Sequence, residues 1–362
     1  MPTNPYENPD FARSYVVSEV DRSKNRYEWE VTHPATLQFL NNSVSRVLDY
    51  GCGSGIFTAG INYAGRSSLN PSLQSIGTDA SLEMLQYAAM ISAKTEGVSF
   101  QAWDASVEES TLQDKSFDRV FAKLVLNYVS SENLREAVMP RLRECLNDEG
   151  LLVAVLPNPL REVSYSKSNY EAMNEIDVNV GNFSPGSSTR SYRHTYEEMI
   201  NAADQAGFAY GALLGLPDVR FEPYKRQLMK IAHPMPMVLD TLNAAKRWVY
   251  VFGATEASAE NFDSAVGRFE HWRASQYPEI ADRAHIRVRG YSTDDVDLPL
   301  EVPHDALYDY QDTFNPDNKN RVTLRGDLAE RMTPKQKIRI AKELARRGLR
   351  ESINLNDILV AV

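Results

Sequence analysis

Apolar runs of strand length alternate with longer amphipathic segments from Arg46 to about Pro159, and this alternation limits the folds that the chain can adopt. Buried strands are predicted at RVLDYG, LQSIGTDA, VSFQAWDA, FDRVFAKLVL and GLLVAVLPNP. Amphipathic helices, with apolar residues three and four apart, are predicted at GIFTAGINYA, LEMLQYAAMISAKT and ENLREAVMPRLRECL. Strands that alternate with helices in this way predict a parallel sheet with right-handed crossovers.

Length and composition narrow the class of protein. A chain of 362 residues, 43% of them hydrophobic, is long enough for one large domain with an appendage or for two domains. No apolar run approaches the roughly 20 residues of a membrane span, and the polar start MPTNPYENPDFARSY lacks the apolar core of a signal peptide. We therefore expect a cytoplasmic protein that does not enter a membrane.

Charge and cysteine usage exclude further classes. The formal net charge of −10 argues against broad nucleic-acid binding, because phosphate backbones are held mainly by clustered Lys and Arg. Cys52 and Cys145 are too few for a disulfide framework and lack a metal-binding spacing, so we expect free thiols and predict no metal site. Small molecules or proteins are the expected partners.

The stretch VLDYGCGSG, residues 47–55, places a glycine-rich turn between a predicted strand and a predicted helix. Such a turn lets the backbone approach a ligand closely and aims helix N-terminal amides at it. A phosphate-binding P-loop would need a lysine after Gly55, and a dinucleotide fingerprint would need a third glycine or alanine where Ile56 or Thr58 stands. Asp49, just before the glycines, would repel a pyrophosphate but favours a ligand with a cationic amine.

Asp49 followed by alternating glycines resembles the first motif of the class I S-adenosylmethionine-dependent methyltransferases. The resemblance runs from about Tyr15 to Ala232 and is strongest to the small-molecule enzymes related to the ubiquinone and menaquinone methyltransferases. It implies an α/β, Rossmann-like fold whose seven-stranded, mainly parallel sheet is flanked by helices. It also implies S-adenosyl-L-methionine as cofactor and S-adenosyl-L-homocysteine as product.

The resemblance assigns cofactor contacts to particular residues. Asp79 in SIGTDAS matches the acid that ends the second strand and holds both ribose hydroxyls, a task that suits a carboxylate. Asp104 in QAWDAS matches the acid that faces the adenine amino group, with the Ala105 backbone amide beside it. The implied cofactor residues are Tyr15 on an N-terminal lid, Asp49, Gly51, Cys52, Gly53, Gly55, Asp79, Ala80, Met84, Asp104, Ala105, Lys123 and Leu124.

Candidate catalytic residues lie where the acceptor and the transferred methyl group are expected to meet. Asn127 and Tyr128 follow the predicted fourth strand, and His194 precedes a predicted helix. An imidazole titrates near neutral pH, so His194 is the first candidate for a general base or a substrate anchor. Each side chain also has a structural interpretation that the sequence leaves open, namely loop packing for Asn127 and Tyr128 and helix capping for His194.

The predicted organisation has three parts. They are an N-terminal helical lid at residues 1–40, a cofactor-binding methyltransferase domain at 41–238 with a substrate loop at 160–194, and an additional α+β C-terminal subdomain at 239–362. We also expect a helix capped by Thr195, a late strand at KRQLMKIA and a basic helix from Pro334 to Arg347. The C-terminal subdomain is expected to form a homo-oligomer contact or to complete the acceptor pocket.

The sequence therefore predicts transfer of a methyl group to O, N or C of a small-molecule acceptor. Two alternatives stay open: a cyclase or isomerase with the same fold and cofactor, and an enzyme that modifies protein or RNA and docks through the C-terminal subdomain. A DNA target is disfavoured, because AKLVLNYV stands where adenine-amino methyltransferases carry an Asn-Pro-Pro-aromatic loop.

Overall fold

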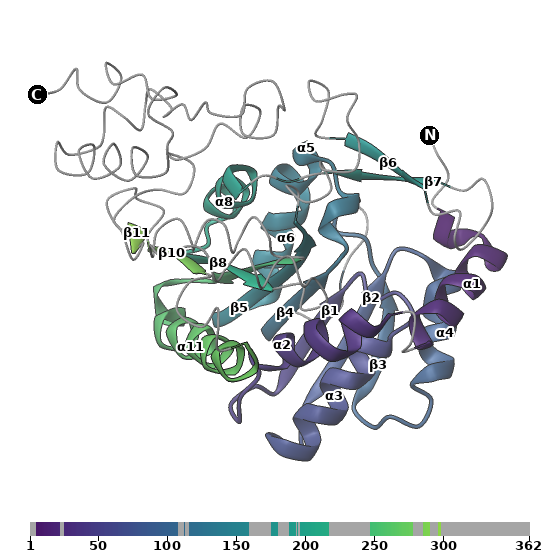
Figure 1. Cartoon of the computed structure of the whole chain (residues 1–362), viewed down its shortest axis with the longest axis horizontal. Coiled ribbons are helices and arrows are strands. Elements are labelled where there is room, and N and C mark those ends of the chain that lie inside the picture. Colours follow the sequence, from purple (N-terminus) through teal and green to yellow (C-terminus); the bar gives the residue numbers. More distant parts are fainter. Residues whose placement is uncertain are drawn as a thin grey trace, which may run out of the picture.

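A central sheet of nine strands organises the part of the chain that the computed structural model describes (Figure 1). The described residues are 5–21, 25–107, 112, 116–158, 175–179, 188–192, 194, 196–216, 247–277, 285–289 and 296–297. The strands of this sheet are β1 (Arg46–Tyr50), β2 (Gln74–Asp79), β3 (Val98–Ala102), β4 (Phe117–Lys123), β5 (Leu146–Pro157), β8 (Tyr210–Leu216), β9 (Arg247–Gly253), β10 (His285–Arg289) and β11 (Val296–Asp297). Their order is β11-β10-β8-β9-β5-β4-β1-β2-β3.

β1 is the middle one of five parallel strands. It pairs with β2 on one side and with β4 on the other, and these continue to β3 and β5. β9 pairs antiparallel with both β5 and β8, and β10 and β11 extend the sheet beyond β8 in antiparallel pairing. The predicted Rossmann-like, mainly parallel α/β sheet is confirmed by the seven adjacent strands β8-β9-β5-β4-β1-β2-β3. β10 and β11 are additional to the seven strands expected.

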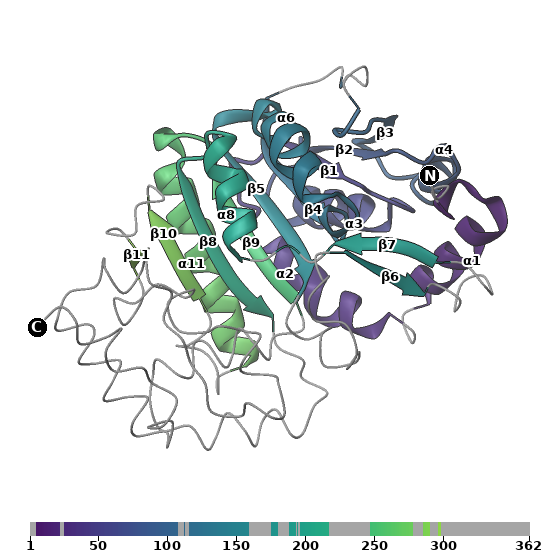
Figure 2. The ribbon, with the colours of Figure 1, turned by 90° about the horizontal axis from the view of Figure 1, so that it is seen from above.

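Helices cover both faces of the sheet (Figures 1 and 2). α2 (His33–Leu37), α3 (Ile56–Ser68) and α11 (Ala259–Gln276) pack on one face, and α6 (Met139–Cys145) and α8 (Tyr196–Gln205) pack on the other. α1 (Pro9–Val20) packs on α4 (Leu82–Ile91). The described residues also include short helical segments: η1 (Pro5–Glu7), η2 (Glu28–Thr32), η3 (Leu126–Tyr128), α5 (Ser131–Asn133), η4 (Leu134–Val138) and η6 (Glu256–Ser258).

Alternating side chains along β5 and β9 build an apolar core on each face. In β5, Leu151 and Val153 are buried on the α11 face, whereas Leu152 and Ala154 are buried on the α6 face. β9 alternates in the same way, with residues 249 and 251 on one face and residues 248, 250 and 252 on the other. Burial on both faces explains why these strands appear in the sequence as continuous apolar runs.

The central sheet continues past the domain boundary predicted between residues 238 and 239. β9 lies between β5 and β8, and α11 contributes Phe262 and Phe269 to the core on one face. This boundary is therefore placed too early, because the run RWVYVFG is a strand of the central sheet and does not belong to a separate subdomain.

Parts of the predicted organisation fall outside the described residues. These parts are most of the substrate loop at 160–194, the strand at KRQLMKIA and the basic helix from Pro334 to Arg347. Within the loop, the structure describes a two-stranded antiparallel hairpin of β6 (Glu175–Asn179) and β7 (Ser188–Tyr192). The helix expected after Thr195 is α8, which is followed by Gly207 at φ 81°. Across the described ranges, no helix combines the length and the apolar character that a membrane crossing requires.

Shortened chains test the place of β9 in the sheet. A chain that ends at Val238 is expected to lose its cooperative thermal unfolding, because β5 and β8 lose the strand between them. A chain that ends at Tyr277 keeps β9 and α11 and is expected to unfold cooperatively. Circular dichroism melts and size-exclusion chromatography of both chains measure the difference. A cooperative melt of the chain that ends at Val238 would contradict this strand order.

A partly buried ion pair fastens the segment before α2 to the sheet. Arg247 Nη2, at the start of β9, lies 3.1 Å from Glu28 Oε1, with 19% and 13% of the two side chains exposed. Beside it, the Tyr27 hydroxyl donates to the Leu216 carbonyl at the end of β8 at 3.2 Å. Burial alone would raise the pKa of Glu28, but the nearby charges of Arg247 and Lys123 lower it to about 2.

Arg247→Met is expected to lower the free energy of unfolding by about 3 kcal/mol at pH 7, because it leaves the Glu28 carboxylate partly buried without its partner. The pKa of Glu28 is lower in the folded chain, so the pair stabilises the fold above about pH 4.5 and this stabilisation is lost as the pH falls toward 2. The difference between wild type and variant should therefore shrink over that range in urea titrations. Arg26→Met, which breaks the exposed pair with Glu30, should change stability little at any pH.

Candidate functional site

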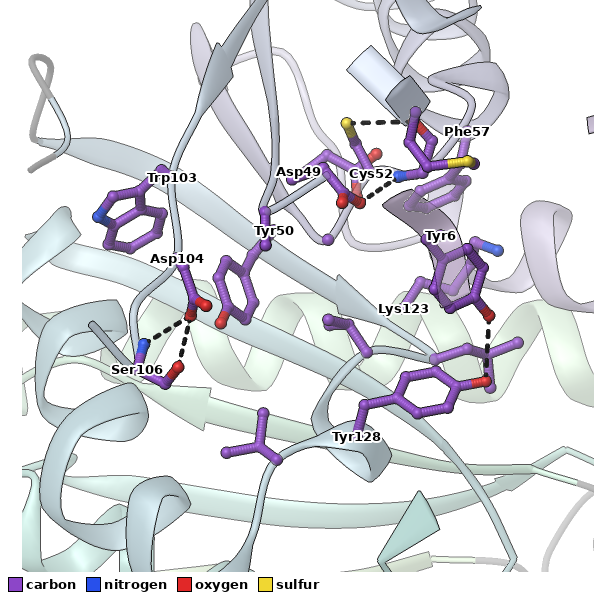
Figure 3. A pocket seen from close by; sticks show the side chains of 18 of the residues that line it. Tyr6, Asp49, Tyr50, Cys52, Phe57, Trp103, Asp104, Ser106, Lys123 and Tyr128 are labelled. Carbon is purple, nitrogen blue, oxygen red and sulfur yellow. Dashed lines mark hydrogen bonds between the residues drawn. The ribbon is translucent and has the colours of Figure 1, made fainter. Parts of the chain in front are cut away.

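A pocket of about 490 Å³ lies at the carboxyl-terminal ends of the parallel strands (Figure 3), and residues of α1 and β7 contribute to its lining. This edge of an open α/β sheet is where such folds bind ligands. The pocket is lined by Pro5, Tyr6, Tyr15, Glu19, Asp49, Tyr50, Gly51, Cys52, Gly53, Phe57, Asp79, Ala80, Met84, Trp103, Asp104, Ser106, Lys123, Leu124, Val125, Tyr128, Val129, Ser130, Asn133 and Tyr192.

The glycine turn follows β1 and forms the floor of the pocket. Gly51, Gly53 and Gly55 have φ angles of 69°, 54° and 73°, which glycine adopts without strain. A Cβ on Gly51 would overlap with the side chain of Val125, so the close approach of the turn to the β4 loop requires glycine. Gly55 lies outside the lining, where it is the N-cap residue before α3 and leaves room for the Phe100 ring.

Cys52 lies between the glycines and is held by backbone contacts. Its N–H donates to the Thr78 carbonyl at 2.8 Å, which joins the turn to β2. Burial raises the pKa of the Cys52 thiol well above its usual value. The thiol is therefore protonated at neutral pH and contributes shape to the pocket wall.

Asp49 presents a buried carboxyl group from β1. Only 1% of the residue is exposed, and the Thr58 hydroxyl donates to its Oδ2 at 2.6 Å. Burial raises the pKa of Asp49 to about 7, although the Thr58 hydrogen bond and the charge of Lys123 act in the opposite direction. A cation placed in the pocket would favour the ionised form of Asp49.

Asp79, the last residue of β2, links the glycine turn to α4. Its Oδ2 accepts from the Gly53 N–H and its Oδ1 accepts from the Ser81 N–H, both at 2.9 Å. Ser81 in turn caps α4, because its Oγ accepts from the Met84 N–H at 3.2 Å. Each carboxylate oxygen of Asp79 can accept a second hydrogen bond, so the group is able to bind a pair of ligand hydroxyls.

Asp104 lies at the end of the pocket formed by Trp103 and Tyr50 (Figure 3). Its Oδ1 accepts from the Ser106 N–H at 2.8 Å and from the Ser106 hydroxyl at 2.7 Å. The Trp103 and Tyr50 rings pack edge to face, with centroids 5.4 Å apart. An aromatic wall beside a carboxylate suits a flat ligand group that carries hydrogen-bond donors.

The N-terminal helix α1 closes one side of the pocket. Tyr15 and Glu19 of α1 line it, and the Ser54 hydroxyl in the glycine turn donates to Glu19 Oε2 at 2.5 Å. Ser81 Oγ donates to the Tyr6 carbonyl at 2.8 Å, which ties η1 to the start of α4. The predicted N-terminal lid residues thus lie against the strand ends.

Ala80 and Met84 continue the lining from β2 into α4. Met84 is 1% exposed and packs with Ala12 and Val16 of α1. This contact fixes where α1 crosses the pocket. Both residues line the pocket, and their role in cofactor binding stays a prediction.

Lys123, Leu124 and Tyr128 form the wall that follows β4. Lys123 Nζ lies 5.4 Å from the centroid of the Phe57 ring, and Leu124 has a φ of 57°, an uncommon value for leucine. The Tyr6 hydroxyl donates to the Tyr128 hydroxyl at 3.4 Å and bridges the two walls (Figure 3). Burial raises the pKa of Tyr6 well above its usual value, so this phenol stays protonated.

The structure places three further predicted residues behind the lining. Ala105, Asn127 and His194 are 0%, 6% and 2% exposed and do not face the pocket. His194 Nε2 donates to the Leu126 carbonyl at 2.9 Å, and Asn127 Nδ2 donates to Ser191 Oγ at 3.4 Å. Burial lowers the pKa of His194 and keeps the imidazole neutral, the form that a general base requires. Its place behind the lining, however, gives it no contact with the pocket from which it could take a proton.

Several lining residues were missed by the sequence prediction. Pro5, Tyr6 and Glu19 come from the N-terminal segment, and Trp103 and Tyr50 neighbour the predicted acids. Trp103 and Tyr50 could have been inferred from their place at strand ends. The N-terminal residues carry no local signal, because their position depends on how α1 packs against α4.

Residues 41–203 match the family model of a methyltransferase domain. The matched range includes β1 to β5 and the three aspartates of the pocket, whereas α1 precedes this range. The chain also resembles the malonyl-[acyl-carrier protein] O-methyltransferase of Legionella pneumophila, with 30% identity over 148 residues. That match covers 39% of this chain and 48% of the relative, so the chain spans about half the length of the curated relative.

Solved structures of similar arrangement were also found. The PH0226 protein of Pyrococcus horikoshii OT3 has a TM-score of 0.47 and 15% identity, with 65% of this chain and 93% of that chain covered. A putative S-adenosylmethionine-dependent methyltransferase from Listeria monocytogenes has a TM-score of 0.44 and 15% identity, with 64% of this chain and 99% of that chain covered.

Two glycine substitutions test the close approach of the turn to the β4 loop. Gly51→Ala is expected to destabilise the protein by about 1 to 3 kcal/mol, because it imposes a positive φ on alanine and a clash with Val125. Gly60→Ala, at an exposed site of α3 with open space around it, should stabilise by about 0.5 to 1 kcal/mol. Thermal melts of both variants measure the effects. Equal stability changes would contradict a special role of Gly51.

Proposed function

We propose that this chain binds S-adenosyl-L-methionine in the described pocket and transfers its methyl group to O, N or C of a small-molecule acceptor. The observation that carries the proposal is the convergence of Asp49, Asp79 and Asp104, from three neighbouring strands, around one glycine turn. The match of this region to a methyltransferase domain supports the same function.

The residues of the pocket fit the parts of this cofactor. Asp79 offers two oxygens to the ribose hydroxyls, and Asp104 with Trp103 offers an acceptor and an aromatic wall to the adenine. Asp49 supplies negative charge next to the cationic part of the ligand. The pocket volume of about 490 Å³ is within the usual range for a ligand of this size.

The bound cofactor would supply an electrophilic methyl group on a sulfonium. The chain's own contribution is then to orient both reactants and to limit water. Tyr6 and Tyr128 bridge the walls of the pocket, and Tyr192 lines it from β7. No side chain is required to form a covalent intermediate, since the acceptor attacks the methyl carbon directly.

The first acceptor to test follows from the similarity to the curated relative. The curated relative is named for O-methylation of a malonyl group on a carrier protein. An acyl group with a free terminal carboxylate, such as a malonyl group, is therefore the first acceptor to test. Amines, phenols and enols follow. A screen with S-adenosylmethionine labelled on its methyl group would measure transfer. Formation of S-adenosylhomocysteine without a labelled acceptor product would argue against methyl transfer.

Cofactor binding is expected to stabilise the folded chain. S-adenosylhomocysteine at about one hundred times its dissociation constant should raise the free energy of unfolding by about 2.7 kcal/mol. Asp79→Asn keeps the shape of the side chain but removes its charge and one acceptor, so the same ligand should bind it more weakly. Thermal melts with and without ligand measure both effects. An unchanged wild-type melting temperature at saturating ligand would contradict the proposal.

Binding of S-adenosylhomocysteine is also expected to weaken as the pH falls below about 7. The pKa of Asp49 is about 7 in the free chain, and the ligand ammonium favours the carboxylate, so protons compete with the ligand. The dissociation constant should rise by up to about tenfold per pH unit below pH 7 for one linked proton. Asp49→Asn should show a shallower pH dependence in isothermal titration calorimetry between pH 6 and pH 8. If Asp49→Asn shows the same pH dependence of the dissociation constant as wild type, the linked proton belongs to another group.

A further inference from the structure

Glu19 carries a carboxylate into the pocket from α1, which lies outside the residues that match the methyltransferase family model. The Ser54 hydroxyl donates to its Oε2 at 2.5 Å, so the side chain is turned toward the glycine turn. On the same helical turns, Val17 and Val20 are 59% and 52% exposed. The end of α1 therefore presents an acid inward and apolar residues outward, the opposite of what packing alone would select.

The charges around Glu19 are unbalanced in the described part of the pocket. Burial raises the pKa of Glu19, the charge of Lys123 and the Ser54 hydrogen bond act against this, and the neighbouring Glu28 and Asp79 raise it further. Lys123 is the lysine that lines the pocket, and it acts on both Glu19 and Asp49. A cationic ligand group near Glu19 would offset the excess negative charge of the carboxylates. Lys123 could then pair with a negative group of the same ligand.

The Glu19 carboxylate and the Lys123 ammonium line the same cavity, so together they offer a partner for each charge of a zwitterionic α-amino acid. Figure 3 shows Lys123, Phe57 and Tyr6 gathered at one end of the pocket, away from Trp103 and Asp104. The end formed by Trp103 and Asp104 suits the adenine. The end with Lys123 is therefore left for the amino-acid part of the ligand.

We propose that Glu19 is a specificity-determining residue that binds the ammonium of the amino-acid part of the cofactor, with Lys123 placed to receive its carboxylate. This inference rests on the proposed function. Its consequence is that α1 closes on the pocket more firmly when the ligand carries an amino-acid group, because the ligand then connects α1 to the strand ends.

Two ligands and two variants test the proposal in the full-length chain. S-adenosylhomocysteine carries the amino-acid group, whereas 5′-methylthioadenosine keeps the adenosine and the sulfur but lacks it. Glu19→Gln keeps an oxygen that accepts from Ser54 and removes only the charge. Asp10→Asn removes the same charge from an exposed position of the same helix and serves as the matched control.

Isothermal titration calorimetry at pH 7.5 gives the six affinities, those of both ligands for wild type and for each of the two variants. Glu19→Gln should weaken S-adenosylhomocysteine binding by at least about tenfold and should change 5′-methylthioadenosine binding by less than about twofold. Asp10→Asn should bind both ligands as wild type does. Equal weakening of both ligands by Glu19→Gln would indicate a structural role for Glu19 and would overturn the inference, as would unchanged affinity for both. Wild-type protein that binds neither ligand would overturn the proposed function itself, and the inference with it.

Discussion

The parallel pairing of β1 with both of its neighbours determines where the chemistry of this chain can lie. Asp49 stands opposite Gly77 of β2 and Phe121 of β4, so the strands end at the same edge of the sheet. The absence of a side chain at Gly77 leaves room for the Cys52 thiol and the Phe100 ring, both of which a Cβ there would crowd. A shift of this register by one residue would turn Asp49 to the other face and separate it from Asp79.

This edge concentrates carboxylates that the free chain stabilises only in part. Backbone N–H groups of Gly53 and Ser81 hold Asp79, a hydroxyl group holds Asp49 and another holds Glu19. Burial nevertheless raises the pKa of each of these three carboxyl groups. The folded chain thus bears an electrostatic cost at its pocket that a cationic ligand would relieve, a common arrangement at binding sites.

The sequence predicted most of the pocket residues that lie at or next to the ends of the parallel strands. An acid at a strand end followed by glycines is a short-range pattern that singles out Asp49, and the family resemblance adds Asp79 and Asp104, which line the same pocket. Glu19 and Tyr6 reach the pocket only through the packing of α1 on α4, which no nearby residue announces. For His194, position in the chain did not reveal side-chain direction, and the imidazole points to the Leu126 carbonyl. β9 was missed although its apolar run is of strand length, because the preceding residues lack the alternation that organises the first half of the chain.

The position of β9 also bears on the order in which the chain can fold during synthesis. β5 and β8 leave the ribosome first, and each has an edge that only β9 covers in the finished sheet. Until residues 247–253 emerge, those two edges expose unpaired backbone groups together with apolar side chains, which are the features that promote association between partly folded chains. The pocket lies on the half of the sheet made earlier, so the binding site can form while the sheet is still open. Completion of the fold, and protection from aggregation, waits for a strand that contributes nothing to the lining of the pocket.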